Sequence, residues 1–268
     1  MDFNHDGAWD YQDQLGPAIH CPQIIKNIVV DEYRVEWLNM SDPDEDFYSK
    51  NHMAGGLAFT HPQVIGGVEY QGARISMETG LIKKVVTVPG HDTWETGKHY
   101  NPGTFTVTLL KYSSVTQRAV HHRTYQLRQG TTIGHLIDKI IARQMHHFLF
   151  LPYTREGRWK GCGDHLLHTW AVFVRDGDIT SANADEDDAM PLADELVYTY
   201  ITGGAKTYEE VGRGWWVSHN PVQDALTPET AFTNRRLTHQ LPPSPEVAAA
   251  GVDEEEEHVD EEDATDED

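Results

Sequence analysis

The order of patterns along the chain predicts an α+β domain, in which a mainly antiparallel sheet is packed by two or three helices. Short β-branched and aromatic runs fill the first half of the sequence, and the first long helical periodicity begins only near residue 131. Strands that come first and helices that come later favour this arrangement over alternating β-α units. We divide the chain into an irregular N-terminal segment (1–22), a single folded domain (23–240) and a disordered acidic tail (241–268).

The strand predictions rest on runs of β-branched and aromatic residues. Two short strands are expected near the start, at 24–30 and 33–38, and a hairpin is expected from 73–78 and 81–88. The strongest run is 104–112, and 119–127 is expected to be its antiparallel neighbour. We interpret the glycines between residues 51 and 72 as turns, because their spacing does not match a phosphate-binding loop.

Two helices are predicted from apolar periodicity. The first follows a cap at Thr131 or Thr132. Its apolar stripe consists of Ile133, Leu136, Ile137, Ile140, Ile141 and Met145. The second begins at Cys162 and ends at Gly177. A strand at 146–151 is expected between them, and 192–201 is interpreted as a third helix.

Charge is spread unevenly along the chain. The net charge is −22, and 253–268 alone carries 12 acidic residues without a lysine or arginine. Without this tail, 31 acidic residues stand against 21 basic ones and form no basic stripe, which argues against binding to nucleic acid or to an anionic membrane. The tail itself is expected either to bind a basic protein by charge or to keep the chain soluble.

The sequence predicts an intracellular protein, either cytoplasmic or nuclear. No apolar run approaches the roughly 18–20 residues of a membrane span, and the first residues are too polar for a secretory signal. The two cysteines, Cys21 and Cys162, do not make a disulfide framework, so both thiols are expected to be reduced.

Cys162 is the residue with the clearest potential for chemistry. It stands between two glycines where a helix is predicted to begin, and the unpaired N–H groups and dipole of a helix N-terminus favour the thiolate. A thiolate nucleophile needs a base within reach and a third group that orients the base. His99, before the strand 104–112, and His121 and His122, on the next strand, are the candidate partners.

The segments KHYNPGTFTVTLL and GCGDHLLHTW, within residues 91–176, carry a resemblance to permuted papain-like thiol proteins. In this lecithin retinol acyltransferase and NlpC/P60-like group, a strand histidine and a second polar strand residue precede a cysteine that opens a helix. The resemblance implies a hydrolase or acyltransferase with Cys162 as nucleophile, His99 as base, and His121 or His122 as the orienting group. The layout also resembles uncharacterised fungal domains, which imply no activity.

A non-catalytic interpretation of Cys162 is favoured by the sequence alone. Cys162 shares a helical face with Leu166 and Trp170, and free cysteine is among the most buried residue types. The chain would then be a domain that binds a protein or a small ligand and carries an acidic tail.

A zinc site is the remaining alternative. Cys162 and His165, near His146 and His147, have the ligand types that zinc prefers. The spacing of Cys162, His165 and His168 prevents all three from sharing one helical face, and the usual spacing of structural zinc ligands is absent. We therefore expect neither a resident metal nor a cofactor.

Overall fold

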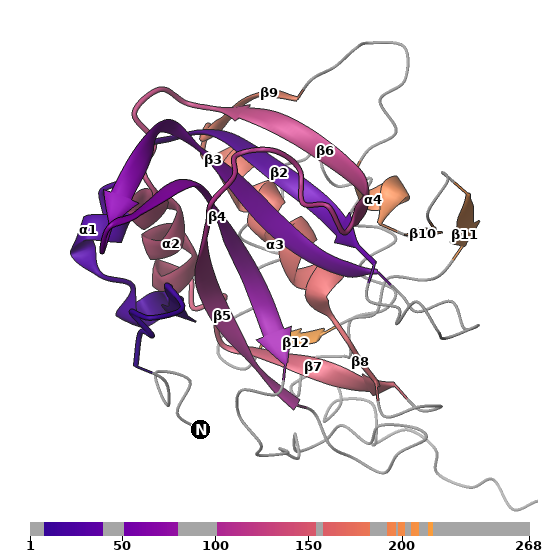
Figure 1. Ribbon diagram of the computed structural model, residues 1–268. Coiled ribbons are helices and arrows are strands. Elements are labelled where there is room, and N and C mark those ends of the chain that lie inside the picture. The colour runs from indigo at the N-terminus through magenta and orange to yellow at the C-terminus, as the bar shows by residue number, and fades with distance from the viewer. Residues whose placement is uncertain are drawn as a thin grey trace, which may run out of the picture.

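The computed structural model of the 268-residue chain describes residues 8–39, 51–79, 101–153, 158–182, 192–196, 198–201, 205–208 and 214–216. Within these residues the protein has an α+β fold with a mainly antiparallel sheet, as the sequence predicts (Figure 1). No helix in these ranges has the length and apolar character needed to cross a membrane. The tail (241–268) and the expected strand 81–88 lie outside the described residues.

One large sheet contains most of the described strands. In chain order the strands are β1 (Leu15–Pro17), β2 (Val30–Leu38), β3 (His52–Ile65), β4 (Val68–Thr79), β5 (Asn101–Leu110), β6 (Ala119–Leu127), β7 (Phe148–Tyr153), β8 (Arg158–Lys160), β9 (Ile179–Ala182), β10 (Tyr198–Tyr200), β11 (Lys206–Tyr208) and β12 (Gly214–Trp216). The sheet order is β12-β7-β5-β4-β3-β2-β6-β9, with β1 beside β5 and β8 beside β7. Strands β10 and β11 form a separate pair, and all these pairings are antiparallel.

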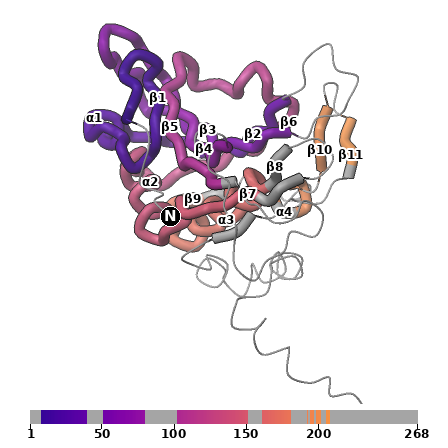
Figure 2. The backbone as a smooth tube through the Cα atoms, turned by 90° about the horizontal axis from the view of Figure 1, so that it is seen from below, coloured from indigo at the N-terminus to yellow at the C-terminus, as the bar shows by residue number. Residues whose placement is uncertain are grey.

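The two longer helices lie on the same face of the large sheet. The helices are α1 (Gln23–Lys26), α2 (Ile133–Ala142), α3 (Cys162–Arg175) and α4 (Leu192–Glu195), and a 3-10 turn spans Ala18–His20. Figures 1 and 2 show α3 running across the sheet, with α2 on the same side. Both longer helices confirm their predictions: the Thr132 hydroxyl caps α2 by accepting from the His135 N–H at 3.1 Å, and Gly177 follows α3 with a φ of +70°.

Strand β2 shows how the core is built. Tyr33, Val35 and Trp37 alternate along it and are fully buried in the main hydrophobic cluster. Glu36, on the opposite face, is also buried, because Thr116 from the segment after β5 donates its hydroxyl to the Glu36 carboxylate at 2.6 Å. A charged residue is thus tolerated on this strand because its oxygen has a partner.

The expected strand at 24–30 is wrong for most of its length. Gln23–Lys26 forms the helical turn α1, and β2 begins only at Val30. Ile25 and Ile28, three residues apart, are buried, whereas Ile24 is exposed. The apolar residues of this run therefore meet the core with helical rather than alternating spacing, and Pro22, which suits a helix start, precedes them.

The sheet order also differs from the expected pairing. Strand β6 has the predicted bounds, but its neighbours are β2 and β9, not β5. Most of the glycines read as turns lie inside strands: Gly55 and Gly56 are in β3, and only Gly66 and Gly67 form a turn. A Cβ on Gly55 would lie 2.9 Å from the Tyr33 ring, so this glycine serves close packing.

Two further expectations, the irregular segment 1–22 and the helix 192–201, need correction. Within the N-terminal segment expected to be irregular, Leu15–Pro17 pairs with β5, because burial of Trp9 and Ala18 docks this segment onto the core. The helix expected at 192–201 stops at Glu195, since Asn51 binds both backbone groups of Tyr200 and holds it in β10.

Candidate active site

The start of α3 is fixed by packing at Gly161. This residue has a φ of +143°, and a Cβ there would lie 2.9 Å from the ring of Phe148, so only glycine fits. The next residue, Cys162, begins the helix and is partly exposed. Cys162 therefore stands at the N-terminus of α3, at the helix start that the sequence predicts.

His52 and Glu78 are brought together by the pairing of β3 and β4. His52 begins β3, and Glu78 is the penultimate residue of β4. Because Gly55 lies opposite Ile75 in this antiparallel pair, the same register places His52 opposite Glu78. The His52 Nε2–H donates to Glu78 Oε1 at 3.1 Å, and the Ser76 hydroxyl donates to the same oxygen at 2.6 Å.

The third member of this group is Cys162, whose side chain interacts with the His52 imidazole and raises its pKa. Since Nε2 of the imidazole faces Glu78, Nδ1 is the ring nitrogen available to the sulfur. The His52 imidazole thus lies between the Cys162 sulfur and the Glu78 carboxylate. We call these three residues the Cys162 triad.

The electrostatics of the triad favour a charged imidazole. Burial alone would lower the pKa of His52, but its hydrogen bonds to Cys162 and Glu78 raise that pKa to about 10. Burial alone would raise the pKa of Glu78, but the interaction with His52 and the Ser76 hydrogen bond lower it to about 2. At neutral pH, His52 is therefore protonated between two groups that accept its protons.

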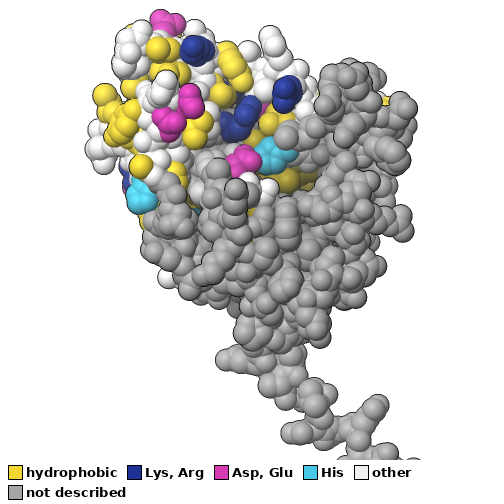
Figure 3. All heavy atoms as spheres, turned by 60° about the horizontal axis from the view of Figure 1, so that its bottom comes forward, with side chains coloured by type: hydrophobic (Ala, Val, Ile, Leu, Met, Phe, Trp, Pro, Cys, Tyr) yellow, Lys and Arg dark blue, Asp and Glu magenta, His cyan; other side chains and the backbone are white. Residues whose placement is uncertain are grey.

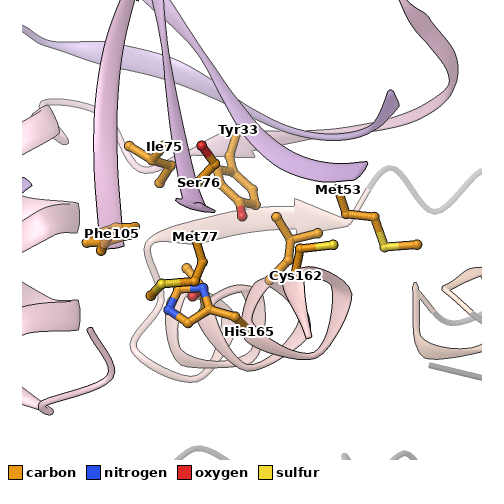
Figure 4. Close-up of a pocket in the computed structure, with 10 residues that line it drawn as sticks. Tyr33, Met53, Ile75, Ser76, Met77, Phe105, Cys162 and His165 are labelled. Carbon is orange, nitrogen blue, oxygen red and sulfur yellow. The ribbon is translucent and has the colours of Figure 1, made fainter. Parts of the chain in front are cut away.

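A narrow pocket lies next to Cys162, between the sheet and α3 (Figure 4). Its volume is about that needed to hold one water molecule. Tyr33 reaches into the space from β2, and Cys162 and His165 face it from α3 (Figure 4). The lining residues are Tyr33, Met53, Ile75, Ser76, Met77, Phe105, Cys162, His165, Leu166 and Thr169.

Of the four predicted catalytic residues, Cys162 is the one that the structure places in the triad. His99 lies outside the described residues. His121 interacts with Glu195 at 3.3 Å and stacks on Tyr200 at 4.0 Å between ring centroids. The histidine and the acidic residue that the structure brings together next to Cys162 are His52 and Glu78.

His122 also takes a different place from the one expected. It lies opposite Glu36 in the β2–β6 pair, and being adjacent to His121 it points to the other face of the sheet. Burial and the neighbouring His121 lower the pKa of His122. Adjacent strand residues cannot both face α3, so at most one of this pair could have served Cys162.

The zinc alternative lacks a geometry that supports it. Burial lowers the pKa of His165 to about 3 and that of His146 to about 4, and the His146 and His147 rings lie 4.1 Å apart. Among the residues that the structure describes, no three histidine, cysteine or acidic side chains are placed to hold one metal ion. Cys162 is engaged by His52 instead.

The described surface shows no gathering of positive charge on the face drawn in Figure 3. Lysine and arginine side chains are interspersed there with acidic and apolar ones. On the described part of this face, the mixed surface offers no basic stripe for a phosphate backbone.

Comparison with known proteins gives no indication of the function of this chain. No protein family, no curated protein and no solved structure matches this chain. The chemistry of the Cys162 triad is therefore the basis on which a function is assigned.

Proposed function

We propose that this protein is a cysteine-dependent acyl-transfer enzyme, either a hydrolase or an acyltransferase. Cys162 is the nucleophile, His52 is the base, and Glu78 orients the imidazole. The observation that carries this proposal is the His52–Glu78 hydrogen bond next to Cys162, which interacts with the His52 imidazole and stands at a helix N-terminus. Nucleophile, base and orienting group in this order are the parts that nucleophilic catalysis requires.

The reaction follows from the positions of these groups. The Cys162 thiolate attacks the carbonyl carbon of an acyl donor, and the N–H groups of the first turn of α3 stabilise the resulting oxyanion. When the bond to the leaving group breaks, protonated His52 gives its proton to that group, and a thioester on Cys162 remains. Water or another acceptor then loses a proton to His52 and attacks the thioester, which releases the acyl product and restores the thiolate.

Cys21 provides an unreactive cysteine of the same protein for comparison. It is buried in the main hydrophobic cluster, and burial raises its pKa to about 12. Cys162 is partly exposed and has an imidazole beside its sulfur. The contrast favours the catalytic interpretation of Cys162 over the packing interpretation preferred from the sequence.

The resemblance to permuted papain-like thiol proteins supports one part of this proposal, the nucleophile. Residues 91–176 carry that resemblance, and Cys162 is the residue among them that belongs to the triad. His52 and Glu78 lie before this stretch, so the roles proposed for them rest on the geometry of the site.

Alkylation by iodoacetamide across pH tests the proposed function. A thiolate paired with a histidine of raised pKa should make the Cys162 rate nearly constant between about pH 6 and pH 9. In His52→Gln the rate should instead fall about tenfold for each unit of pH below about 8.5, as for an ordinary thiol. Peptide mass spectrometry reads Cys162 and Cys21 separately.

Cys21 is the internal control, because it should stay unmodified until the protein is denatured. A wild-type Cys162 rate that rises tenfold per pH unit, and that His52→Gln does not change, would contradict the proposal. Glu78→Gln is expected to give an intermediate profile, since it keeps the shape of the orienting group and removes its charge.

For the acidic tail we propose a separate role, in which it binds a basic protein inside the cell, in the cytoplasm or nucleus. The support is its composition, 12 acidic residues in 253–268 with no lysine or arginine. The chain without 253–268 still has 31 acidic against 21 basic residues, so the deletion should lower, not abolish, the salt concentration needed for elution from a polylysine column, and it should leave Cys162 alkylation unchanged. Equal retention of the full chain and the truncated chain would show that the tail binds no basic partner.

A further inference from the structure

Three buried polar atoms line the pocket beside Cys162 without a hydrogen-bond partner among the described residues. They are Tyr33 Oη, His165 Nε2 and Thr169 Oγ1. Tyr33 is 0% exposed, and His165 and Thr169 are each 3% exposed. Buried polar atoms without a partner are costly, so three in one small pocket point to a ligand that supplies the partners.

Close packing holds these side chains in place. Gly55 leaves room for the Tyr33 phenol, because a Cβ there would lie 3.0 Å from the hydroxyl oxygen. Phe173 meets the Tyr33 ring edge-on, with 5.5 Å between the centroids. On α3, His165 packs against the rings of Phe105 and Phe148, at 5.7 and 5.3 Å. The polar atoms of the pocket are therefore preorganised.

The three atoms offer complementary hydrogen bonds. Burial raises the pKa of Tyr33 above its ordinary value, so its hydroxyl remains a donor. Burial keeps His165 neutral, and a hydrogen bond to the Met145 backbone uses its single N–H, which leaves Nε2 as an acceptor. The Thr169 hydroxyl both donates and accepts. A hydroxyl group, which also donates and accepts, is the smallest organic group that satisfies all three.

We infer that this pocket receives a hydroxyl group of the substrate and thereby selects a short acyl group with a hydroxyl on the carbon next to the carbonyl. The inference rests on the proposed function, because it places the carbonyl on the Cys162 sulfur. The pocket adjoins Cys162 and has room for about one water-sized group, so the polar substituent must be small and must lie close to the carbonyl. Met53, Met77 and Leu166 supply apolar contacts for the carbon.

A pair of isosteric substrates tests this selectivity. Glycolyl and propionyl phenyl thioesters differ by a hydroxyl in place of a methyl group. With each rate divided by the rate of the same thioester with free cysteine, the wild-type enzyme should prefer glycolyl by roughly tenfold or more, because a site with buried polar groups rejects an analogue that leaves them unpaired. A hexanoyl thioester should react more slowly than either, since the pocket is short.

Variants identify the pocket as the source of the preference. Tyr33→Phe and Thr169→Val each remove one hydroxyl with little change of shape, and each should lower the glycolyl-to-propionyl ratio severalfold. Tyr70→Phe is the matched control, since Tyr70 is a buried tyrosine on β4 outside the pocket, and its ratio should equal that of the wild type.

Two results would overturn the inference, and they are distinguishable. If both thioesters acylate Cys162 at equal normalised rates, the inferred selectivity is wrong and the proposed function stands. If neither thioester acylates Cys162, as read from the intact mass of the wild-type protein, both the selectivity and the proposed function are wrong. The wild-type comparison needs no variant, so it stands even if a substituted protein fails to fold.

Discussion

At the scale of single residues, the site depends on the charge of Glu78. Its carboxylate accepts hydrogen bonds from both His52 and Ser76, and these interactions outweigh burial and lower its pKa to about 2. A carboxyl whose pKa is lower in the folded state stabilises the protein above its unfolded pKa, near 4.5. This contribution is lost as the pH falls toward the folded value.

Urea unfolding of the wild type and of Glu78→Gln therefore has a predicted pH dependence. The wild type should be the more stable protein above about pH 5, and the difference should shrink as the pH falls toward about 2. Glu69→Gln is the control, because Glu69 lies on the same strand and has no ion-pair partner among the described side chains. A stability difference that is equal at pH 3 and pH 7 would show that Glu78 does not carry this charge interaction.

The sequence predicted the nucleophile and missed its partners for a physical reason. Cys162 stands at a helix start that apolar periodicity and flanking glycines make visible. His52 and Glu78 are distant from it in sequence, and they meet only through strand register. Register is set by tertiary pairing. The sequence alone therefore cannot tell which of His99, His121 and His52 lies next to Cys162.

At the scale of elements, a bulge decides the register that builds the triad. Strands β3 and β4 are joined at Gly66 and Gly67, a signal that the sequence does carry. If the pairing next to this turn continued along β3 without a shift, His52 would lie opposite a residue beyond the end of β4. The register shift between Ala58 and Gln63 brings His52 opposite Glu78 instead. Pro62 lies in this stretch and signals an interruption of the ladder, because proline has no backbone N–H, but it does not tell how many residues the register shifts. The hairpin was therefore predictable, and the pairing of His52 with Glu78 was not.

The N-terminus of α3 should be sensitive to a methyl group at Gly161. Gly161→Ala places a Cβ 2.9 Å from the Phe148 ring at a φ of +143°, which should displace Cys162 and slow its alkylation at least about tenfold. Gly177→Ala is the control at the other end of the helix, because its φ is +70° and its Cβ would meet nothing within 4 Å. It should cost about 1 kcal/mol of stability and leave alkylation unchanged. Equal alkylation rates in the two variants would contradict the role given to Gly161.

At the scale of the whole molecule, Asp178 joins the helical layer to the sheet. It is fully buried in the turn after α3, and its carboxylate meets His135 at 2.9 Å and Arg128 at 3.0 Å, as well as Lys139. These partners come from α2 and from the end of β6. The fold class was predictable from the order of patterns, but this junction was not, because Asp178 resembles any other charged residue in a turn.

Asp178→Asn should therefore be strongly destabilising. It leaves the cations without their shared carboxylate, which should cost about 3 kcal/mol in urea unfolding at neutral pH. Asp138→Asn is the matched control, because Asp138 forms an ion pair with Lys26 at the surface and should cost less than about 1 kcal/mol. Similar losses in the two variants would mean that the Asp178 cluster does not join the layers.

The protonation of His52 is the most direct measure of the central claim, which is that Cys162, His52 and Glu78 act as one unit. Side-chain NMR of the histidines across pH, in the wild type and in Cys162→Ala, reads it without any substrate. We predict that the wild-type His52 ring stays protonated through neutral pH and titrates near 10, and that it titrates at lower pH in Cys162→Ala. Titration near the ordinary histidine value of about 6.5 in both proteins would contradict the account.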